Sequence, residues 1–174
     1  GGGSSDAAFF IRLLNDKFEL GISWGEMHHY ARQLGSDCSF FVSNKPAFAE
    51  GKGDQYESTQ LDLSKYYIVL IYPNIHINTA KAYSGVKPKP AVRSLENDII
   101  QLPVEKWKDH IHNDFEDSIF PQFPEIKNIK EQLYSEGAVY AAMSGSGSTV
   151  YGIFKGVTDL KNRFKDCFIF EGKL

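Results

Sequence analysis

The sequence predicts an α+β fold for this chain of 174 residues. Helical patterns occur near the start and in the middle of the chain, residues 66–72 form one continuous apolar run, and short strands follow at irregular intervals. A doubly wound parallel sheet would instead show regular alternation of strand and helix. Apolar residues make up 42% and charged residues 24% of the chain. These fractions are typical of a folded domain, and the length suits one domain or two small lobes.

Charge and cysteine content exclude several classes of protein. The net charge is −3, which gives no indication of a nucleic-acid-binding surface. The apolar run 66–72 is too short to cross a bilayer. Cys38 and Cys167 form neither a disulfide framework nor a metal-binding spacing, which favours a reducing compartment and a cytoplasmic location.

Two helices are expected in the N-terminal third. Residues 6–15 carry apolar side chains at helical spacing, with Ser4 or Ser5 as the N-cap. Ser23 and Glu26 have the spacing of a capping box before a second helix that ends at Gly35. The two apolar stripes consist of Phe9, Phe10, Leu13 and Leu14 in the first helix, and of Met27, Tyr30, Ala31 and Leu34 in the second.

Strands are expected next, and helices dominate the middle of the chain. Residues 40–43 and 46–50 read as strands, with turn residues at 51–54. The unbroken apolarity of residues 66–72 predicts a strand buried on both faces.

Proline residues mark the helices that follow. Pro103 is expected in the first turn of one helix, and Pro124 opens another with the core stripe Ile126, Ile129 and Leu133 that ends at Gly137. The C-terminal part predicts a strand at 149–154, a helix at 159–164 and a short strand at 168–170.

Two glycine- and serine-rich segments are the main chemical signal. Residues 1–5 precede a helix, where backbone amides converge and no side chain prevents close approach of an anion. Residues 144–148 form a second such segment, so the two could line one phosphate site. The alternatives are a cloning linker at residues 1–5 and a flexible connection between strands at 145–148. Neither segment is a P-loop, since no Gly-Lys-Ser/Thr follows.

Asp37 is the best candidate for acid–base chemistry. It is a single carboxylate among small residues, directly before an apolar run. An aspartate often takes the proton from a hydroxyl group during phosphoryl transfer. The alternative is a turn or N-cap aspartate without a chemical role.

Five motifs, in order, resemble those of the GHMP kinases. They are residues 1–8 (GGGSSDAA), 34–41 (LGSDCSFF), 46–54 (PAFAEGKGD), 113–116 (NDFE) and 142–149 (AMSGSGST). Within this superfamily they are most similar to the 4-diphosphocytidyl-2-C-methyl-D-erythritol kinase family. Because the motifs span nearly the whole chain, a chance match to all five is very unlikely.

The resemblance implies a reaction and a domain arrangement. ATP would phosphorylate the 2-hydroxyl of 4-diphosphocytidyl-2-C-methyl-D-erythritol, a step of the non-mevalonate isoprenoid pathway, with Mg²⁺ as cofactor. Residues 1–60 would be the end of an ATP-binding lobe, and residues 61–174 a C-terminal domain of ferredoxin-like character. The N-terminal part of that lobe would be missing from this chain, so the fragment alone is expected to be inactive.

The resemblance also assigns roles to individual residues. Asp37 falls on the catalytic aspartate, and Ser5 on a serine that contacts Mg²⁺. Thr79 and Tyr83 match a substrate-binding segment whose aromatic residue stacks on cytosine; the alternative for Tyr83 is a core residue. The ATP phosphates would be bound by Gly1, Gly2, Gly3, Ser4 and Ser5, with a second glycine loop at Gly145, Ser146 and Gly147.

Some residues depart from the family pattern. Cys38 and Ser39 replace a common Val-Pro pair, Ala142 replaces a common arginine, and no lysine occupies the position of the catalytic lysine. Two other functions therefore stay open: a GHMP kinase for another small alcohol, such as homoserine or mevalonate, and an inactive nucleotide-binding fragment.

Overall fold

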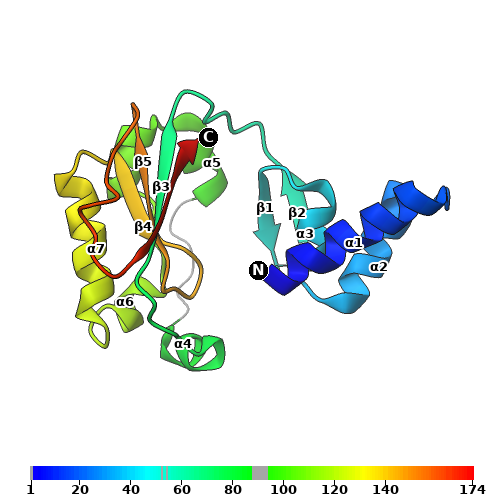
Figure 1. Ribbon diagram of the computed structural model, residues 1–174, viewed down its shortest axis with the longest axis horizontal. Coiled ribbons are helices and arrows are strands. Elements are labelled where there is room, and N and C mark those ends of the chain that lie inside the picture. Colours follow the sequence, from blue (N-terminus) through cyan, green and yellow to red (C-terminus); the bar gives the residue numbers. More distant parts are fainter. Residues whose placement is uncertain (1, 52, 54, 88–93) are drawn as a thin grey trace. The chain divides into compact units, whose positions relative to one another are not determined.

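The chain divides into two compact units, Gly1–Leu61 and Asp62–Leu174. A computed structural model describes residues 2–51, 53, 55–87 and 94–174 (Figure 1). The division falls beside the expected boundary between residues 60 and 61, while the assignment of the first unit to an ATP-binding lobe stays a prediction. Among the described residues, no helix combines the length and the apolarity that a membrane span requires.

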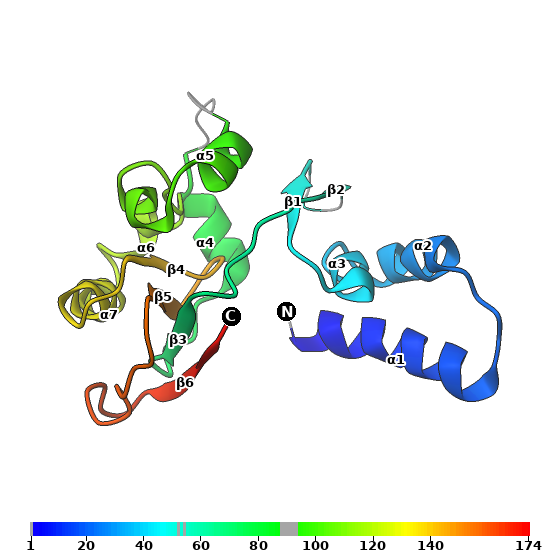
Figure 2. The same ribbon diagram turned by 90° about the horizontal axis from the view of Figure 1, so that it is seen from above.

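The first unit contains three helices and a β-hairpin. Helix α1 (Gly2–Phe18) runs alongside α2 (Trp24–Leu34) and α3 (Cys38–Ser43), as Figure 2 shows. Strands β1 (Ala47–Glu50) and β2 (Gln55–Ser58) pair antiparallel. A small apolar cluster joins the helices and consists of Ala8, Met27, Ala31, Cys38 and Val42.

Helix α1 differs from its prediction at its start and in its buried face. It begins at Gly2, so Ser4 and Ser5 lie inside the helix and not at its N-cap. Ala8 is its buried residue, whereas Phe9 and Phe10 are 44% and 59% exposed. The predicted stripe was therefore wrong, because small side chains at Ala7 and Ala8 face the neighbouring helices.

Helix α2 has the predicted capping box. The Glu26 N–H donates to Ser23 Oγ over 3.3 Å, and the Ser23 N–H donates to Glu26 Oε2 over 2.8 Å. Gly35 ends the helix with an extended backbone, and its N–H donates to the Ala31 carbonyl over 3.2 Å. Only half of the predicted stripe is buried, since Tyr30 and Leu34 are exposed.

The expected strand at 40–43 is helical. Cys38 and Val42, four residues apart, both face the core of the first unit, which is the spacing of a helix face. A short apolar run does not distinguish strand from helix by its pattern alone. The predicted strand at 46–50 is confirmed as β1, and its partner β2 was not predicted.

The turn predicted at residues 51–54 is described only in part. Residues 52 and 54 lie outside the described ones. Gly51 and Gly53 have φ angles of 65° and 78°, which a side chain would disfavour.

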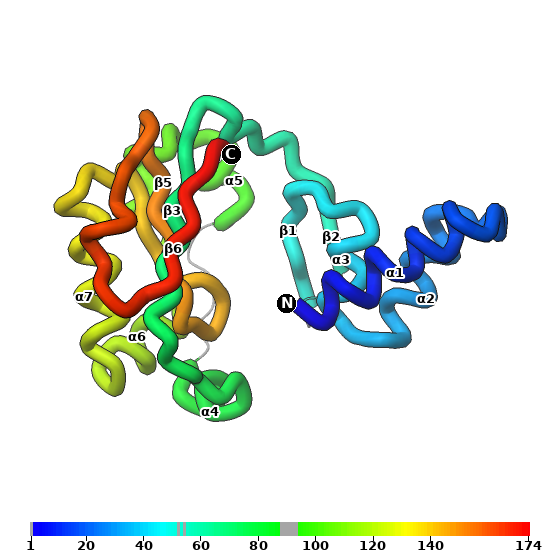
Figure 3. Tube along the Cα trace, viewed as in Figure 1, coloured from blue at the N-terminus to red at the C-terminus, as the bar shows by residue number. Residues whose placement is uncertain are grey.

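The second unit is built on a four-stranded antiparallel sheet. Its strands are β3 (Tyr67–Tyr72), β4 (Tyr140–Met143), β5 (Val150–Phe154) and β6 (Phe168–Lys173), in the order β4-β5-β3-β6. Figure 3 shows β6 beside β3, with residues from both ends of this unit paired. The first and third strands are central, as in a ferredoxin-like arrangement. The predicted α+β class is confirmed.

Helices cover the sheet of the second unit. They are α4 (Thr79–Gly85), α5 (Leu95–Gln101), the 3₁₀ helix η1 (Val104–Asp109), α6 (Glu116–Ile119) and α7 (Pro124–Ser135). Trp107 of η1 packs edge-on against Tyr140 of β4, with ring centroids 5.6 Å apart.

Helix α7 packs on β4 and β5 and supplies the predicted core stripe, which is confirmed. Its members Ile126, Ile129 and Leu133 are all buried. Ala141 and Met143 of β4 belong to the same apolar cluster as this stripe. Tyr140, whose ring packs against Trp107 of η1, does not belong to it. Because neighbouring residues of a strand point to opposite faces, α7 and η1 lie on opposite faces of β4.

Three expectations for the second unit need correction. Strand β3 buries Val69 and Ile71 completely but leaves Tyr72 37% exposed, so it is not buried on both faces. Pro103 is the N-cap residue of η1 and precedes its first turn. The helix expected at 159–164 is absent: residues 159–160 have no regular structure and 161–164 form a turn and a bend, while Glu171 Oε1 accepts the Leu160 N–H over 2.9 Å and so ties this segment to β6.

We expect Leu133→Ala to lower the free energy of unfolding of the second unit by about 2–5 kcal/mol, because the buried side chain leaves a cavity. Val157, which is 80% exposed, provides the control Val157→Ala, for which a change below about 0.5 kcal/mol is expected. Urea unfolding followed through the NMR signal of Trp107 measures both. Equal effects of the two substitutions would contradict the described core.

Candidate active site

The second glycine loop is a defined turn between β4 and β5. The Ser144 N–H donates to the Thr149 carbonyl over 2.8 Å, and the Gly147 N–H donates to the Ser144 carbonyl over 2.9 Å. Gly145 and Gly147 have φ angles of 53° and 87°, a region that favours glycine. The loop does connect two strands, but its hydrogen bonds give it a fixed shape.

Gly147 also has no room for a side chain. A Cβ atom there would lie 2.7 Å from Met143 Sδ and 2.9 Å from Ile77 Cδ1. The next residue, Ser148, donates its hydroxyl hydrogen to the Ile75 carbonyl over 2.5 Å. The loop is therefore held against the segment that leads into α4.

Asn113 binds the same loop from the other side. Its Nδ2 donates to the carbonyls of Met143 and Gly145 over 2.7 and 2.9 Å. Its Oδ1 accepts the Phe115 N–H over 3.0 Å. One side-chain amide thus links the first half of the turn to the start of α6.

The carboxylate of Glu116 also holds the loop, at the end of β4. The side chain is 2% exposed, and Oε1 accepts the Met143 N–H over 2.8 Å. Lys130 Nζ lies 2.5 Å from Oε2, and His112 Nδ1 lies 3.7 Å away. A buried carboxylate needs such partners, because it would otherwise lose its hydration without compensation. Burial raises the pKa of the nearby Tyr134, whose hydroxyl donates to the Ala141 carbonyl.

Tyr83 and Thr79 lie on α4, which contacts α6, the helix that begins at Glu116. Asn78 caps the helix, its Oδ1 accepting the Lys81 N–H over 3.0 Å. The Tyr83 ring meets Phe115 edge-on, with centroids 4.9 Å apart, and stays 65% exposed. Tyr83 is therefore not a core residue, and its exposed ring can receive another planar group.

The first glycine-rich segment forms the beginning of α1. Gly1 lies outside the described residues, and Gly2 to Ser5 make up the first turn. The first amides of a helix have no acceptor within the helix. Nothing lies within 4 Å of a Cβ built on Gly2 or Gly3, so no described side chain packs against these two glycines.

Ser5 turns its hydroxyl hydrogen toward the helix backbone. Its Oγ donates to the Gly2 carbonyl over 2.7 Å. The oxygen lone pairs stay available, which is what a hard cation such as Mg²⁺ requires. Among the described residues there is no cluster of three His, Cys, Asp or Glu side chains able to hold a metal ion.

Asp37 directly precedes α3 and is exposed. Its carboxylate makes no capping hydrogen bond to that helix and accepts one from Ser36 Oγ over 3.3 Å. It borders a hollow of about 350 Å³ between α3 and the β-hairpin. Asp37 therefore does not cap α3 through its side chain, and its carboxylate is free to face a ligand.

The structure groups the predicted residues into two sets. In the first unit, Ala8 of α1 and Cys38 of α3 share one core cluster, so the helix start and Asp37 lie on packed neighbours. In the second unit, the glycine loop, Asn113 and Tyr83 are joined through the contacts given above.

Asn113 and Glu116 were given no role in the sequence analysis. The signal was present, because both belong to the motif at residues 113–116. Their hydrogen bonds to a loop about thirty residues further along the chain become visible only in the folded structure.

Comparison with known proteins agrees with this arrangement. The family described as GHMP kinases C terminal matches residues 100–166. A 4-diphosphocytidyl-2-C-methyl-D-erythritol kinase of Azobacteroides pseudotrichonymphae is 52% identical over 89% of this chain and 58% of its own length. One of Parabacteroides distasonis is 48% identical over 100% and 65%. Residues 100–166 are thus similar to the C-terminal part of the GHMP kinases.

Solved structures support the same assignment. The crystal structure of a 4-(cytidine 5'-diphospho)-2C-methyl-D-erythritol kinase matches with a TM-score of 0.77 and 26% identity, covering 99% of this chain and 64% of the other. A homoserine kinase from Cytophaga hutchinsonii matches with a TM-score of 0.64 but 10% identity, which shows a shared fold alone. The chain spans 58–65% of the length of the curated relatives described here.

We expect Asn113→Ala to weaken the glycine loop, because two hydrogen bonds to its carbonyls are lost. The second unit should lose about 1–2 kcal/mol of unfolding free energy, and amide exchange at Gly147 should accelerate. Asn128, exposed on α7, provides the control Asn128→Ala. Unchanged exchange at Gly147 in Asn113→Ala, measured by NMR, would mean that Asn113 does not hold the loop.

Proposed function

We propose that the protein containing this chain transfers the γ-phosphoryl group of ATP to the 2-hydroxyl of 4-diphosphocytidyl-2-C-methyl-D-erythritol. The observation that carries the proposal is that one unit holds both a helix that starts in a glycine-rich segment, Gly2–Ser5, and the carboxylate of Asp37, which makes no capping hydrogen bond. The names of the relatives at 48–52% identity favour this acceptor over other small alcohols.

The helix start is proposed to bind the ATP phosphates. Amides without helical acceptors and the positive end of the helix dipole both stabilise an anion there. Gly1 to Ser5 would form this site, and Ser5 Oγ would contact a Mg²⁺ ion bound to the phosphates. The ion would neutralise negative charge on the transferred group.

Asp37 is proposed to act on the hydroxyl group that attacks. Its carboxylate would accept the hydroxyl proton while the oxygen bonds to the γ-phosphorus, and ADP would leave with the electrons of the broken P–O bond. A free carboxylate beside a hollow is suited to this role. The second glycine loop, Gly145, Ser146 and Gly147, is proposed to bind phosphate groups as well.

Tyr83 is proposed to stack on the cytosine base of the acceptor, with Thr79 near it. An exposed ring already fixed edge-on by Phe115 loses little freedom on binding a base. A cytoplasmic location, ATP as the donor and a small cytidyl substrate belong to the same proposal.

Asp37→Asn should lower kcat by about 100-fold or more while the KM for ATP changes little, because a proton acceptor is lost. The assay couples ADP release to NADH oxidation and uses the gene product that contains this chain. Asp16→Asn, on the exposed side of α1, is the matched control. Turnover of Asp37→Asn within a few-fold of the parent would exclude the proposed role.

Tyr83→Ala should raise the KM for the cytidyl substrate about tenfold, since base stacking contributes on the order of 1–3 kcal/mol. Tyr83→Phe keeps the ring and should behave like the parent, and the KM for ATP should be unchanged in both. The same assay with homoserine and mevalonate tests the acceptor. Activity with only these alcohols would show that the proposed substrate is wrong.

A further inference from the structure

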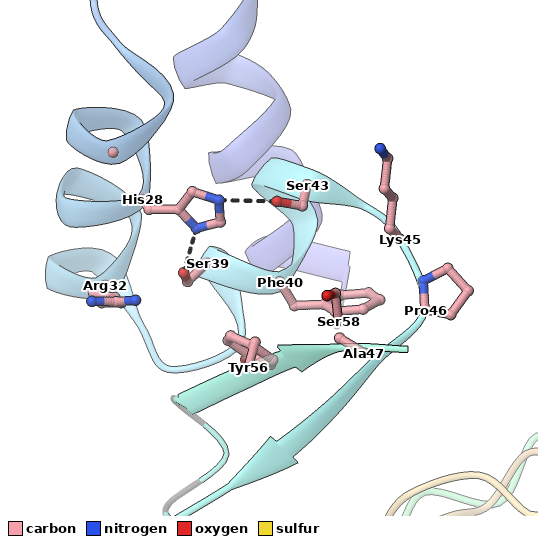
Figure 4. Close-up of a pocket in the computed structure, with 11 residues that line it drawn as sticks. His28, Arg32, Ser39, Phe40, Ser43, Lys45, Pro46, Ala47, Tyr56 and Ser58 are labelled. Atoms are coloured by element: carbon pink, nitrogen blue, oxygen red, sulfur yellow. Dashed lines mark hydrogen bonds between the residues drawn. The ribbon is translucent and has the colours of Figure 1, made fainter. Parts of the chain in front are cut away.

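A pocket of about 490 Å³ lies in the first unit, away from the helix start of α1. Its walls come from α2, α3 and the β-hairpin, and none of its described lining residues belongs to α1. Figure 4 shows His28 of α2 pointing toward Ser39 and Ser43 of α3, with Arg32 further along α2. This volume is in the range of pockets that bind small molecules.

The charge of the pocket is entirely positive. Arg32 and Lys45 line it, and none of its described lining residues is acidic. Neither side chain forms an ion pair with any residue that the structure describes. Two cations that share one concave surface without a counter-charge favour binding of an anion.

His28 organises the hydroxyl groups of the pocket. Its Nδ1 lies 2.8 Å from Ser39 Oγ and its Nε2 lies 3.0 Å from Ser43 Oγ (Figure 4). Burial, and then the charge of Arg32, lower the pKa of His28, so the ring is neutral at neutral pH. A neutral imidazole donates one hydrogen bond and accepts one. Ser39 is fully buried, whereas Ser43 is exposed, so in the tautomer with hydrogen on Nε2 the Ser43 hydroxyl keeps its own hydrogen available for a ligand.

The remaining walls are apolar and aromatic. The rings of Phe40 and Tyr56 lie 6.0 Å apart, and Pro46 and Ala47 continue the surface. Such walls can hold the organic part of a ligand, and an arginine side chain such as that of Arg32 can form paired hydrogen bonds with phosphate oxygens.

We propose that this pocket binds a phosphomonoester carried on a small, flat organic group. Arg32 binds the phosphate, a hydroxyl set by His28 donates to it, and Phe40 with Tyr56 contacts the organic group. The site is separate from the proposed ATP-phosphate site and does not depend on the proposed kinase reaction.

The test is calorimetric titration of phenyl phosphate and inorganic phosphate into the gene product that contains this chain. Phenyl phosphate should bind more tightly than inorganic phosphate. Arg32→Gln should weaken its binding about tenfold, the loss expected for charged hydrogen bonds. Lys17→Gln, the same change of charge on α1, should leave it within twofold. Lys45→Gln provides a second pocket variant if Arg32→Gln fails to fold.

NMR of the same complexes locates the ligand. Phenyl phosphate should shift the His28 ring signals, and not the amides of residues 2–5. Shifts confined to residues 2–5 would overturn this proposal and leave the proposed ATP site intact. Equal weakening by Arg32→Gln and Lys17→Gln, or no binding at millimolar phenyl phosphate, would also overturn it.

Discussion

The buried carboxylate of Glu116 is the interaction on which the second unit depends most. It holds the Met143 N–H at the end of β4 and the ammonium group of Lys130 on α7, so a strand and two helices share one anchor. The side chain of Asn113, three residues earlier, donates hydrogen bonds to the carbonyls of Met143 and Gly145. Because both anchors lie on one short segment, the position of the glycine loop follows from the position of α6. A loop held in this way enters binding already ordered, which reduces the entropy lost when a ligand binds.

Close packing in both units relies on positions without bulky side chains. In the first unit, Ala8 and Ala31 let α1, α2 and α3 approach one another, and the larger residues of α1 remain exposed. In the second, a Cβ on Gly85 would lie 2.9 Å from Ser118 Cβ, so α4 can approach α6 only because of the glycine. That approach is what brings Tyr83 to Phe115. Gly85 is therefore as important for the position of Tyr83, the candidate substrate contact, as the aromatic ring of Phe115.

Local chemistry made part of this fold predictable. The Ser23–Glu26 capping box and the stripe of α7 depend on neighbours within four residues, and both are confirmed. The helix expected at 159–164 is absent, and the contact that ties this segment to β6 comes from Glu171, eleven residues beyond Leu160, outside the local pattern. The prediction of a strand at 40–43 was wrong, because a short apolar run is compatible with both a strand and a helix. For the candidate site, motifs identified the loops and Asp37, whereas the hold of Asn113 on the loop depends on distant pairing that a local pattern does not contain.

Two hollows of the first unit share one aromatic wall. Phe40, Ala47 and Tyr56 border both the basic pocket and the hollow beside Asp37. The Tyr56 hydroxyl also donates to the Ser36 carbonyl over 3.0 Å, one residue before Asp37. A ligand that moves the Tyr56 ring must therefore either break this hydrogen bond or carry the backbone at Ser36 with it. Tyr56 therefore contacts both hollows and the backbone next to Asp37, so its ring position is set by the same hydrogen bond in both.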